Sequence, residues 1–153
     1  MNFEIVVTGK LKTDFIKIGV ERYLKWLSPY AGVNVRSLPL GRGKNIEEVK
    51  KEEAKRYIEL LKGEKHVVVL HEKGKELSSV QFATRIKTWQ NSSVKKVYFL
   101  IGGPYGFAEE ILESGWELFS LSRLTFTHEM ALLLLLEQLY RAETILKGKT
   151  YHY

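Results

Sequence analysis

The sequence predicts an α/β domain with a mainly parallel sheet flanked by helices. Strand-like and helix-like segments alternate along most of the chain, which is the pattern of βαβ units. Residues 66–71 (HVVVLH) and 94–101 (VKKVYFLI) are rich in apolar residues, as strands are when helices cover both faces of a sheet. We expect the crossovers between parallel strands to be right-handed, as they are in almost all proteins.

Each element has its own local signal. Residues 2–8 (NFEIVVT) are rich in β-branched residues and precede a glycine, so they predict the first strand. Apolar residues at helical spacing then predict a helix that Thr13 or Asp14 caps and Pro29 stops. The other expected elements are a strand at 32–38, a helix at 46–61 capped by Asn45, strands at 66–71 and 94–101 with a helix from Ser78 or Ser79 to Trp89 between them, a short helix at about 107–114 and a long helix at about 129–146.

The composition favours one packed domain. Apolar residues make up 44% of the chain and aromatic residues 12%, which is enough for a core, and no linker or repeat interrupts the pattern. We therefore expect a single domain over residues 1–153. The absence of cysteine excludes disulfides and thiolate ligands, and we expect no metal.

The net charge of +6 favours polyanionic partners. Nucleic acid is therefore a candidate partner, although solvated lysines explain the same charge. The longest apolar run, Met130–Leu136, is far shorter than the roughly 20 residues of a membrane helix, and the chain shows no secretory signal. We expect a cytoplasmic protein without a membrane partner.

A glycine-rich loop, Gly102-Gly103-Pro104-Tyr105-Gly106, directly follows the expected strand at 94–101. Ligands of open α/β sheets usually bind beyond the carboxyl ends of the strands, and glycine allows a ligand to approach the backbone. A simple turn between strand and helix would use the same glycines. The loop matches neither a P-loop nor a GxGxxG motif, which argues against a nucleotide or dinucleotide enzyme.

Residues 120–128 (SLSRLTFTH) mix hydroxyl and apolar side chains without a clear period. One interpretation is a loop that ends with Thr127 as the N-cap of the last helix, with Glu129 in its first turn. The other is an apolar slot for a purine ring, made by Leu124 and Phe126 with backbone polar groups around them.

The long last helix carries two features. Glu137 and Arg141 lie four residues apart, which fits an ion pair, most simply a solvated one. Residues 132–136 are five consecutive leucines, so this helix is expected to be deeply buried or to lie at a subunit interface.

These motifs together resemble the RlmH-type family of ribosomal large-subunit methyltransferases, which are single-domain SPOUT proteins. The resemblance covers nearly the whole chain. It rests on Leu70, on residues 74–79 (GKELSS), on the glycine-rich loop, on residues 120–128, on 137–142 (EQLYRA), on Tyr151-His152, and on the basic loop Gly41-Arg42-Gly43-Lys44 with Asn45.

The resemblance implies a C-terminal trefoil knot, a homodimer and S-adenosylmethionine as the methyl donor. The implied acceptor is N3 of a pseudouridine in a stem-loop of 23S rRNA within the assembled ribosome. The implied cofactor residues are Leu70, Gly102, Gly103, Ser122, Arg123, Leu124, Thr125, Phe126 and Thr127. The expected RNA contacts are Arg42, Lys44 and Arg141.

The expected chemistry is an in-line methyl transfer that depends mainly on alignment of donor and acceptor. His128, Glu137 and His152 are the candidate proton acceptors, Arg141 could stabilise the anionic base, and Tyr151 could stack on it. Water could instead take the proton of the weakly acidic imide. A non-catalytic ribosome- or RNA-binding module is the main alternative function.

Four positions depart from the family pattern, namely His71, Glu129, Leu132 and Tyr153. Leu132 and Tyr153 stand where the family usually carries cationic side chains. We therefore expect weaker phosphate contacts at these two positions.

Overall fold

The structure is a computed structural model, and it describes residues 1–151. Its elements are β1 (Asn2–Thr8), α1 (Asp14–Leu27), β2 (Gly32–Leu38), α2 (Ile46–Leu60), β3 (Val67–Glu76), α3 (Ser79–Asn91), β4 (Lys96–Ile101), α4 (Glu109–Leu112), β5 (Glu117–Ser120) and α5 (His128–Leu146).

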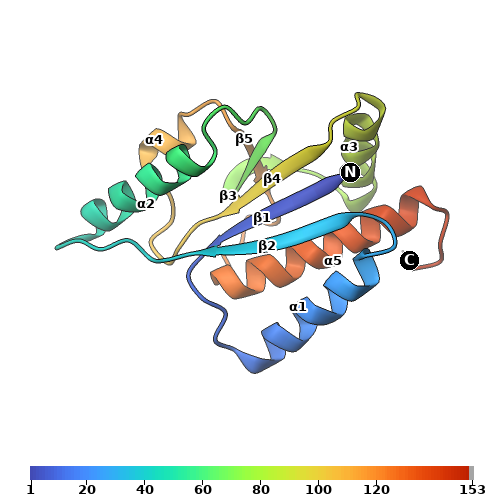
Figure 1. Cartoon of the computed structure of the whole chain (residues 1–153), viewed down its shortest axis with the longest axis horizontal. Helices are drawn as coiled ribbons and strands as arrows, with labels where there is room; N and C mark the ends of the chain where they lie inside the picture. Colours follow the sequence, from blue (N-terminus) through green and yellow to red (C-terminus); the bar gives the residue numbers. More distant parts are fainter. Residues whose placement is uncertain (152–153) are drawn as a thin grey trace.

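The five strands form one parallel sheet with the order β2-β1-β4-β3-β5 (Figure 1). The expected α/β class with a parallel sheet is therefore confirmed. Because all strands run the same way, the loops that follow β1, β3, β4 and β5 leave from the same edge of the sheet. The C-terminal trefoil knot stays a prediction.

Two hydrophobic clusters cover the two faces of the sheet. Alternate residues of β1 point to opposite faces, so Phe3, Ile5 and Val7 join one cluster and Val6 joins the other. Helices α1, α3 and α5 bury their apolar residues in the first cluster, and α2 and α4 in the second. Helices α1 and α5 run side by side across one face (Figure 1).

The leucine run of α5 belongs to the core of the chain itself. Leu132, Leu135, Leu136 and Leu139 are fully buried in the first cluster. The expectation that Leu132 stands at a phosphate-facing position is therefore wrong, because its side chain is buried in the core and cannot contact a phosphate. Tyr153, the other of these two positions, lies outside the described residues.

Three elements differ most from the expectation. Strand β3 continues to Glu76 instead of ending at His71, with a register shift against β5 between Leu70 and Lys75. No strand was expected at 117–120, but these residues form β5 because they pair with β3. Helix α4 keeps only Glu109–Leu112 of the expected 107–114.

Three helix starts follow the capping signals, whereas Thr13 stands at the N-cap position of α1 without the expected side-chain cap bond. Asn45 accepts a hydrogen bond from Glu48 N, Thr127 from Met130 N, and Ser78 with Gln81 forms a full capping box. Glu129 adds a link to the loop after β1, since its carboxylate accepts bonds from Lys12 N and from Thr13. Within residues 1–151 no helix is long and apolar enough to cross a membrane.

We predict that Gly74→Ala destabilises the protein by roughly 1–3 kcal/mol, the usual cost of overpacking. A Cβ at Gly74 would lie 2.6 Å from Leu118 C and from Phe119 N, which are backbone atoms of β5 and cannot rotate away. Chemical denaturation measures the loss, with the exposed neighbour Lys73→Ala as control, expected within about 0.5 kcal/mol of wild type. Equal stability of the two variants would contradict the close approach of β3 and β5.

Candidate active site

A pocket of about 540 Å³ opens at the carboxyl edge of the sheet. The glycine-rich loop forms one wall, the bulged part of β3 a second, and the segment before α5 a third. Its lining residues are Lys50, Leu70, His71, Glu72, Ile101, Gly102, Gly103, Pro104, Tyr105, Gly106, Phe107, Glu109, Leu112, Leu121, Ser122, Leu124, Thr125, Phe126, His128 and Ala131. We call it the glycine-loop pocket.

The fold gathers most of the expected cofactor residues in this pocket. Those that line it are Leu70, Gly102, Gly103, Ser122, Leu124, Thr125 and Phe126. Arg123 instead points outward, where Nε lies 3.5 Å from a carboxylate oxygen of Glu76, and its side chain is 86% exposed. Thr127 is occupied as the N-cap of α5. The N-cap interpretation is therefore confirmed for Thr127, whereas the purine slot of Leu124 and Phe126 stays a prediction.

Leu124 and Phe126 offer apolar surface to a ligand. Leu124 is 73% exposed and Phe126 is 39% exposed, although both are large and apolar. Exposed apolar side chains that gather at a concave site are typical of ligand pockets. The expected apolar slot thus has side chains available to form it.

Glu53 and Thr8 lie directly behind Gly103 and leave little space for a side chain there. A Cβ there would sit 3.2 Å from both carboxylate oxygens of Glu53 and 3.3 Å from Thr8 Cγ2. A side chain at this position would therefore point into the protein. From the sequence we had expected it to point into the space of a ligand. The backbone of Gly103 still lines the pocket.

His128 has one ring nitrogen already engaged. Its Nε2 lies 3.1 Å from the carbonyl oxygen of Lys10, which can only accept a hydrogen bond. The ring therefore carries a proton on Nε2, and Nδ1 keeps its lone pair in the neutral form. Of the proposed proton acceptors on α5, His128 is the one that lines the glycine-loop pocket.

The sequence reasoning missed several charged residues of the pocket. Lys50 comes from α2, His71 and Glu72 from the bulge of β3, and Glu109 from α4. The rule that ligands bind at the carboxyl ends of parallel strands could have indicated His71 and Glu72. Nothing local to Lys50 or Glu109 separates them from solvated charges of a helix.

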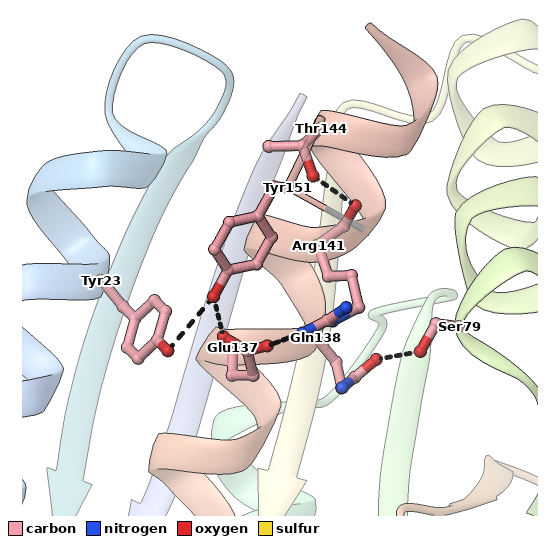
Figure 2. A network of polar contacts seen from close by, with 7 residues as sticks. All are labelled: Tyr23, Ser79, Glu137, Gln138, Arg141, Thr144 and Tyr151. Atoms are coloured by element: carbon pink, nitrogen blue, oxygen red, sulfur yellow. Dashed lines mark hydrogen bonds and ion pairs between the residues drawn. The ribbon is translucent and has the colours of Figure 1, made fainter. Parts of the chain in front are cut away.

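The other candidate residues form a polar network near the far end of α5 (Figure 2). Arg141 donates to Glu137 Oε1 through Nη2 at 2.7 Å and through Nε at 3.1 Å. Tyr151 donates from its hydroxyl to Glu137 Oε2 at 2.5 Å, and its oxygen lies 3.5 Å from that of Tyr23. The pair of Glu137 and Arg141 is not the solvated one expected, since their side chains are 17% and 24% exposed.

This network, which we call the tyrosine network, fixes the ionisation of its members. Partial burial opposes the charge of Glu137, but hydrogen bonds from Tyr151, Tyr23 and Arg141 outweigh it and hold the pKa of Glu137 below its ordinary value. Burial and the neighbouring Glu137 raise the pKa of Tyr151 and that of Tyr23. Glu137 thus acts as an ionised acceptor that orients Arg141 and Tyr151.

One face of α5 connects the tyrosine network with the glycine-loop pocket. His128 and Ala131 line that pocket, and Leu134 and Gln138 line a second one of about 270 Å³ that shares Leu121 and Phe126 with the first. Gln138 accepts a hydrogen bond from Ser79 Oγ at 2.7 Å (Figure 2). Helical rise puts Glu137 about 13 Å beyond His128 along the axis, so the two candidates do not share one contact site.

The two cations of the basic loop lie elsewhere. Arg42 and Lys44 do not line the glycine-loop pocket. They are exposed on the basic loop, whose backbone rests against α2 through bonds from Arg42 N to Glu52 and from Lys44 N to Glu48. His152 lies outside the described residues.

We predict that Glu137→Gln lowers stability by about 1–2 kcal/mol at neutral pH, because the charge-assisted bonds of the tyrosine network are lost. The folded-state pKa of Glu137 is lowered from 4.5, so its stabilisation is complete above that pH and declines as the pH falls through the lowered pKa. Denaturation of both proteins across pH 3 to 7, a range of about 4 units, checks this. A stability difference that persists unchanged at the acidic end would contradict it.

Comparisons with known proteins identify the family. A family profile described as "Predicted SPOUT methyltransferase" matches residues 1–152. Proteins named ribosomal RNA large subunit methyltransferase H are similar over their full length: 58% identical in Kosmotoga olearia, with all of both chains covered, and 42% identical in Thermotoga neapolitana, also with all of both chains covered. The relative in Thermodesulfovibrio yellowstonii is 48% identical, with 99% of this chain and 98% of the relative covered. The chain therefore belongs to the SPOUT methyltransferases, in the group of the ribosomal RNA large subunit methyltransferase H proteins.

Proposed function

We propose that this methyltransferase transfers the methyl group of S-adenosylmethionine to N3 of a pseudouridine in a stem-loop of 23S rRNA, within the assembled ribosome of the cytoplasm. The names of its relatives support the ribosomal RNA substrate. The observation that carries the proposal is the glycine-loop pocket, where expected cofactor residues from strand β3 and from two separate loops line one cavity.

The residues of the pocket fit the proposed cofactor. Its volume of about 540 Å³ lies in the range of pockets for small organic ligands. Leu70, Leu124 and Phe126 provide apolar surface for a purine, and Glu72 and Glu109 provide negative charge that suits a cationic ligand. When bound, S-adenosylmethionine supplies a methyl group activated by its sulfonium charge.

The protein's own part in the reaction is alignment and removal of a proton. Alignment would come from the glycine-rich loop and from the apolar slot, which restrict how a ligand can lie. His128 is the proposed proton acceptor, because it lines the pocket and its bond to Lys10 leaves Nδ1 as the basic atom. Glu137 suits this role less, since three hydrogen-bond donors stabilise its ionised form.

The RNA would lie along the face of α5 that leads from the glycine-loop pocket to the tyrosine network. Arg141 would contact a phosphate there, and Tyr151, with His152 beside it in the sequence, would contact the acceptor stem-loop. Arg42 and Lys44 would add phosphate contacts from the basic loop. The net charge of +6 supports this binding mode.

We further propose that the protein acts as a homodimer that packs through α1. Leu132, Leu135 and Leu136 of α5 do not indicate an interface, because they are buried in the chain's own core. Helix α1, which lies beside α5, instead exposes Phe15, Ile18 and Trp26 at 64%, 60% and 41%, at spacings that put them on one face. Such a stripe of exposed apolar residues is typical of protein interfaces.

We predict that Leu124→Ala weakens binding of S-adenosylhomocysteine about tenfold, because part of the apolar slot is removed. Isothermal titration calorimetry measures the affinity. The matched control is Val80→Ala, which removes an exposed apolar side chain of α3 outside both pockets. No binding by the unmutated protein would contradict the proposed function, and equal affinity of both variants would contradict the assignment of the slot.

We predict that the protein sediments as a dimer and that Phe15→Glu combined with Ile18→Glu converts it to a folded monomer. Two carboxylates at the centre of an apolar interface would have to be buried without partners. Val80→Glu, at a position 52% exposed on α3, is the control and should stay dimeric. A monomer at micromolar concentration for the unmutated chain would reject the dimer.

A further inference from the structure

Acidic side chains of α2 hold the backbone of the basic loop, Gly41-Arg42-Gly43-Lys44. Three backbone N–H groups donate to three carboxylates: Gly41 to Glu53 at 2.8 Å, Arg42 to Glu52 at 2.8 Å, and Lys44 to Glu48 at 2.6 Å. Arg56 of the same helix donates to the carbonyl oxygens of Pro39 and Leu40, just before the loop. These carboxylates thus serve as acceptors that give the loop one defined path.

The two glycines of the loop let it lie directly on α2. A Cβ at Gly41 would be 2.4 Å from Val49 O, and one at Gly43 would be 2.5 Å from Glu48 Cβ. Only residues without side chains fit against the helix there. The two cations between and after them, Arg42 and Lys44, are exposed. The loop therefore presents its charges from a backbone that is already in place.

Glu53 differs from Glu48 and Glu52 because it is buried, with only 2% of its surface exposed. Its Oε2 accepts the bond from Gly41 N, whereas Oε1 has no hydrogen-bond partner among residues 1–151. Both oxygens face Gly103, at 3.2 Å from the place of a Cβ. Thr8, bonded to the Tyr57 hydroxyl at 2.5 Å, supports Gly103 from the same side.

We propose that Glu53 is a positioning residue that couples the glycine-loop pocket to the basic loop, so that cofactor and RNA each strengthen binding of the other. One carboxylate touches both segments: it bonds the backbone of the basic loop, and it packs behind the backbone that lines the pocket. This inference rests on the proposed function of the two sites.

The coupling has a physical basis in the incomplete bonding of Glu53. A buried carboxylate oxygen without a hydrogen-bond donor is energetically unfavourable. The position of the Glu53 carboxylate therefore responds to small shifts of the neighbouring residues. A ligand that fixes Gly103 also fixes the carboxylate behind it, and with it the acceptor of Gly41 N. The basic loop then loses less conformational entropy when phosphates bind Arg42 and Lys44. The second binding event is therefore tighter.

A thermodynamic cycle tests this. Affinity for ribosomes is measured with and without saturating S-adenosylhomocysteine, and affinity for radiolabelled S-adenosylhomocysteine is measured by equilibrium dialysis with and without ribosomes. We expect the unmutated protein to show the same factor in both directions, about fivefold or more, because linkage is reciprocal. Glu53→Asp, which is too short to reach both segments, should bring the factor close to one.

Glu52→Gln is the matched control, since Glu52 also bonds a backbone N–H of the basic loop but lies apart from Gly103. It should weaken ribosome binding at most and leave the factor unchanged, as a purely structural role would. Glu53→Ala, which removes both contacts, replaces Glu53→Asp if that variant does not fold. A factor of one in the unmutated protein, or a normal factor in the Glu53 variants, would overturn the coupling while cofactor binding itself remained. Absence of any cofactor binding would contradict the proposed function and the coupling with it.

Discussion

Parallel pairing of β3 with β4 and of β3 with β5 is the constraint on which the candidate site depends. It places the bulge of β3, the glycine-rich loop after β4 and the segment after β5 at one edge of the sheet. These three segments form the walls of the glycine-loop pocket. Helix α5 completes the pocket because its buried leucines fix it across the sheet, so that His128 reaches the same edge. Its far end carries the tyrosine network.

The sequence predicted the parts of the fold that have strong local signals. The first two strands and the caps at Asn45 and Thr127 follow from periodicity and capping alone. Strand β5 was missed because its four residues have no period of their own and form a strand only by pairing with β3. The leucines of α5 suggested an interface, since a sequence cannot distinguish burial within a chain from burial between chains.

The candidate site also contains residues that the sequence predicted and residues that it missed. The glycine-rich loop and residues 122–126 were predictable from motifs, and most of them line the pocket. Glu53 was not, because its role depends on two segments distant in sequence, Gly41 and Gly103. Three glutamates of α2 are acceptors for the backbone of the basic loop. The exposed cations of the basic loop and the glutamates of α2 therefore belong to one structural unit.

The central claim is that this chain methylates a base of 23S rRNA, and mass mapping of that RNA tests it most directly. Ribosomal RNA from cells with and without the gene is digested, and the fragments are compared. The account predicts that one fragment loses the mass of a single methyl group on a pseudouridine when the gene is absent, and regains it when the unmutated gene is restored. Identical fragment masses in the two strains would contradict the account.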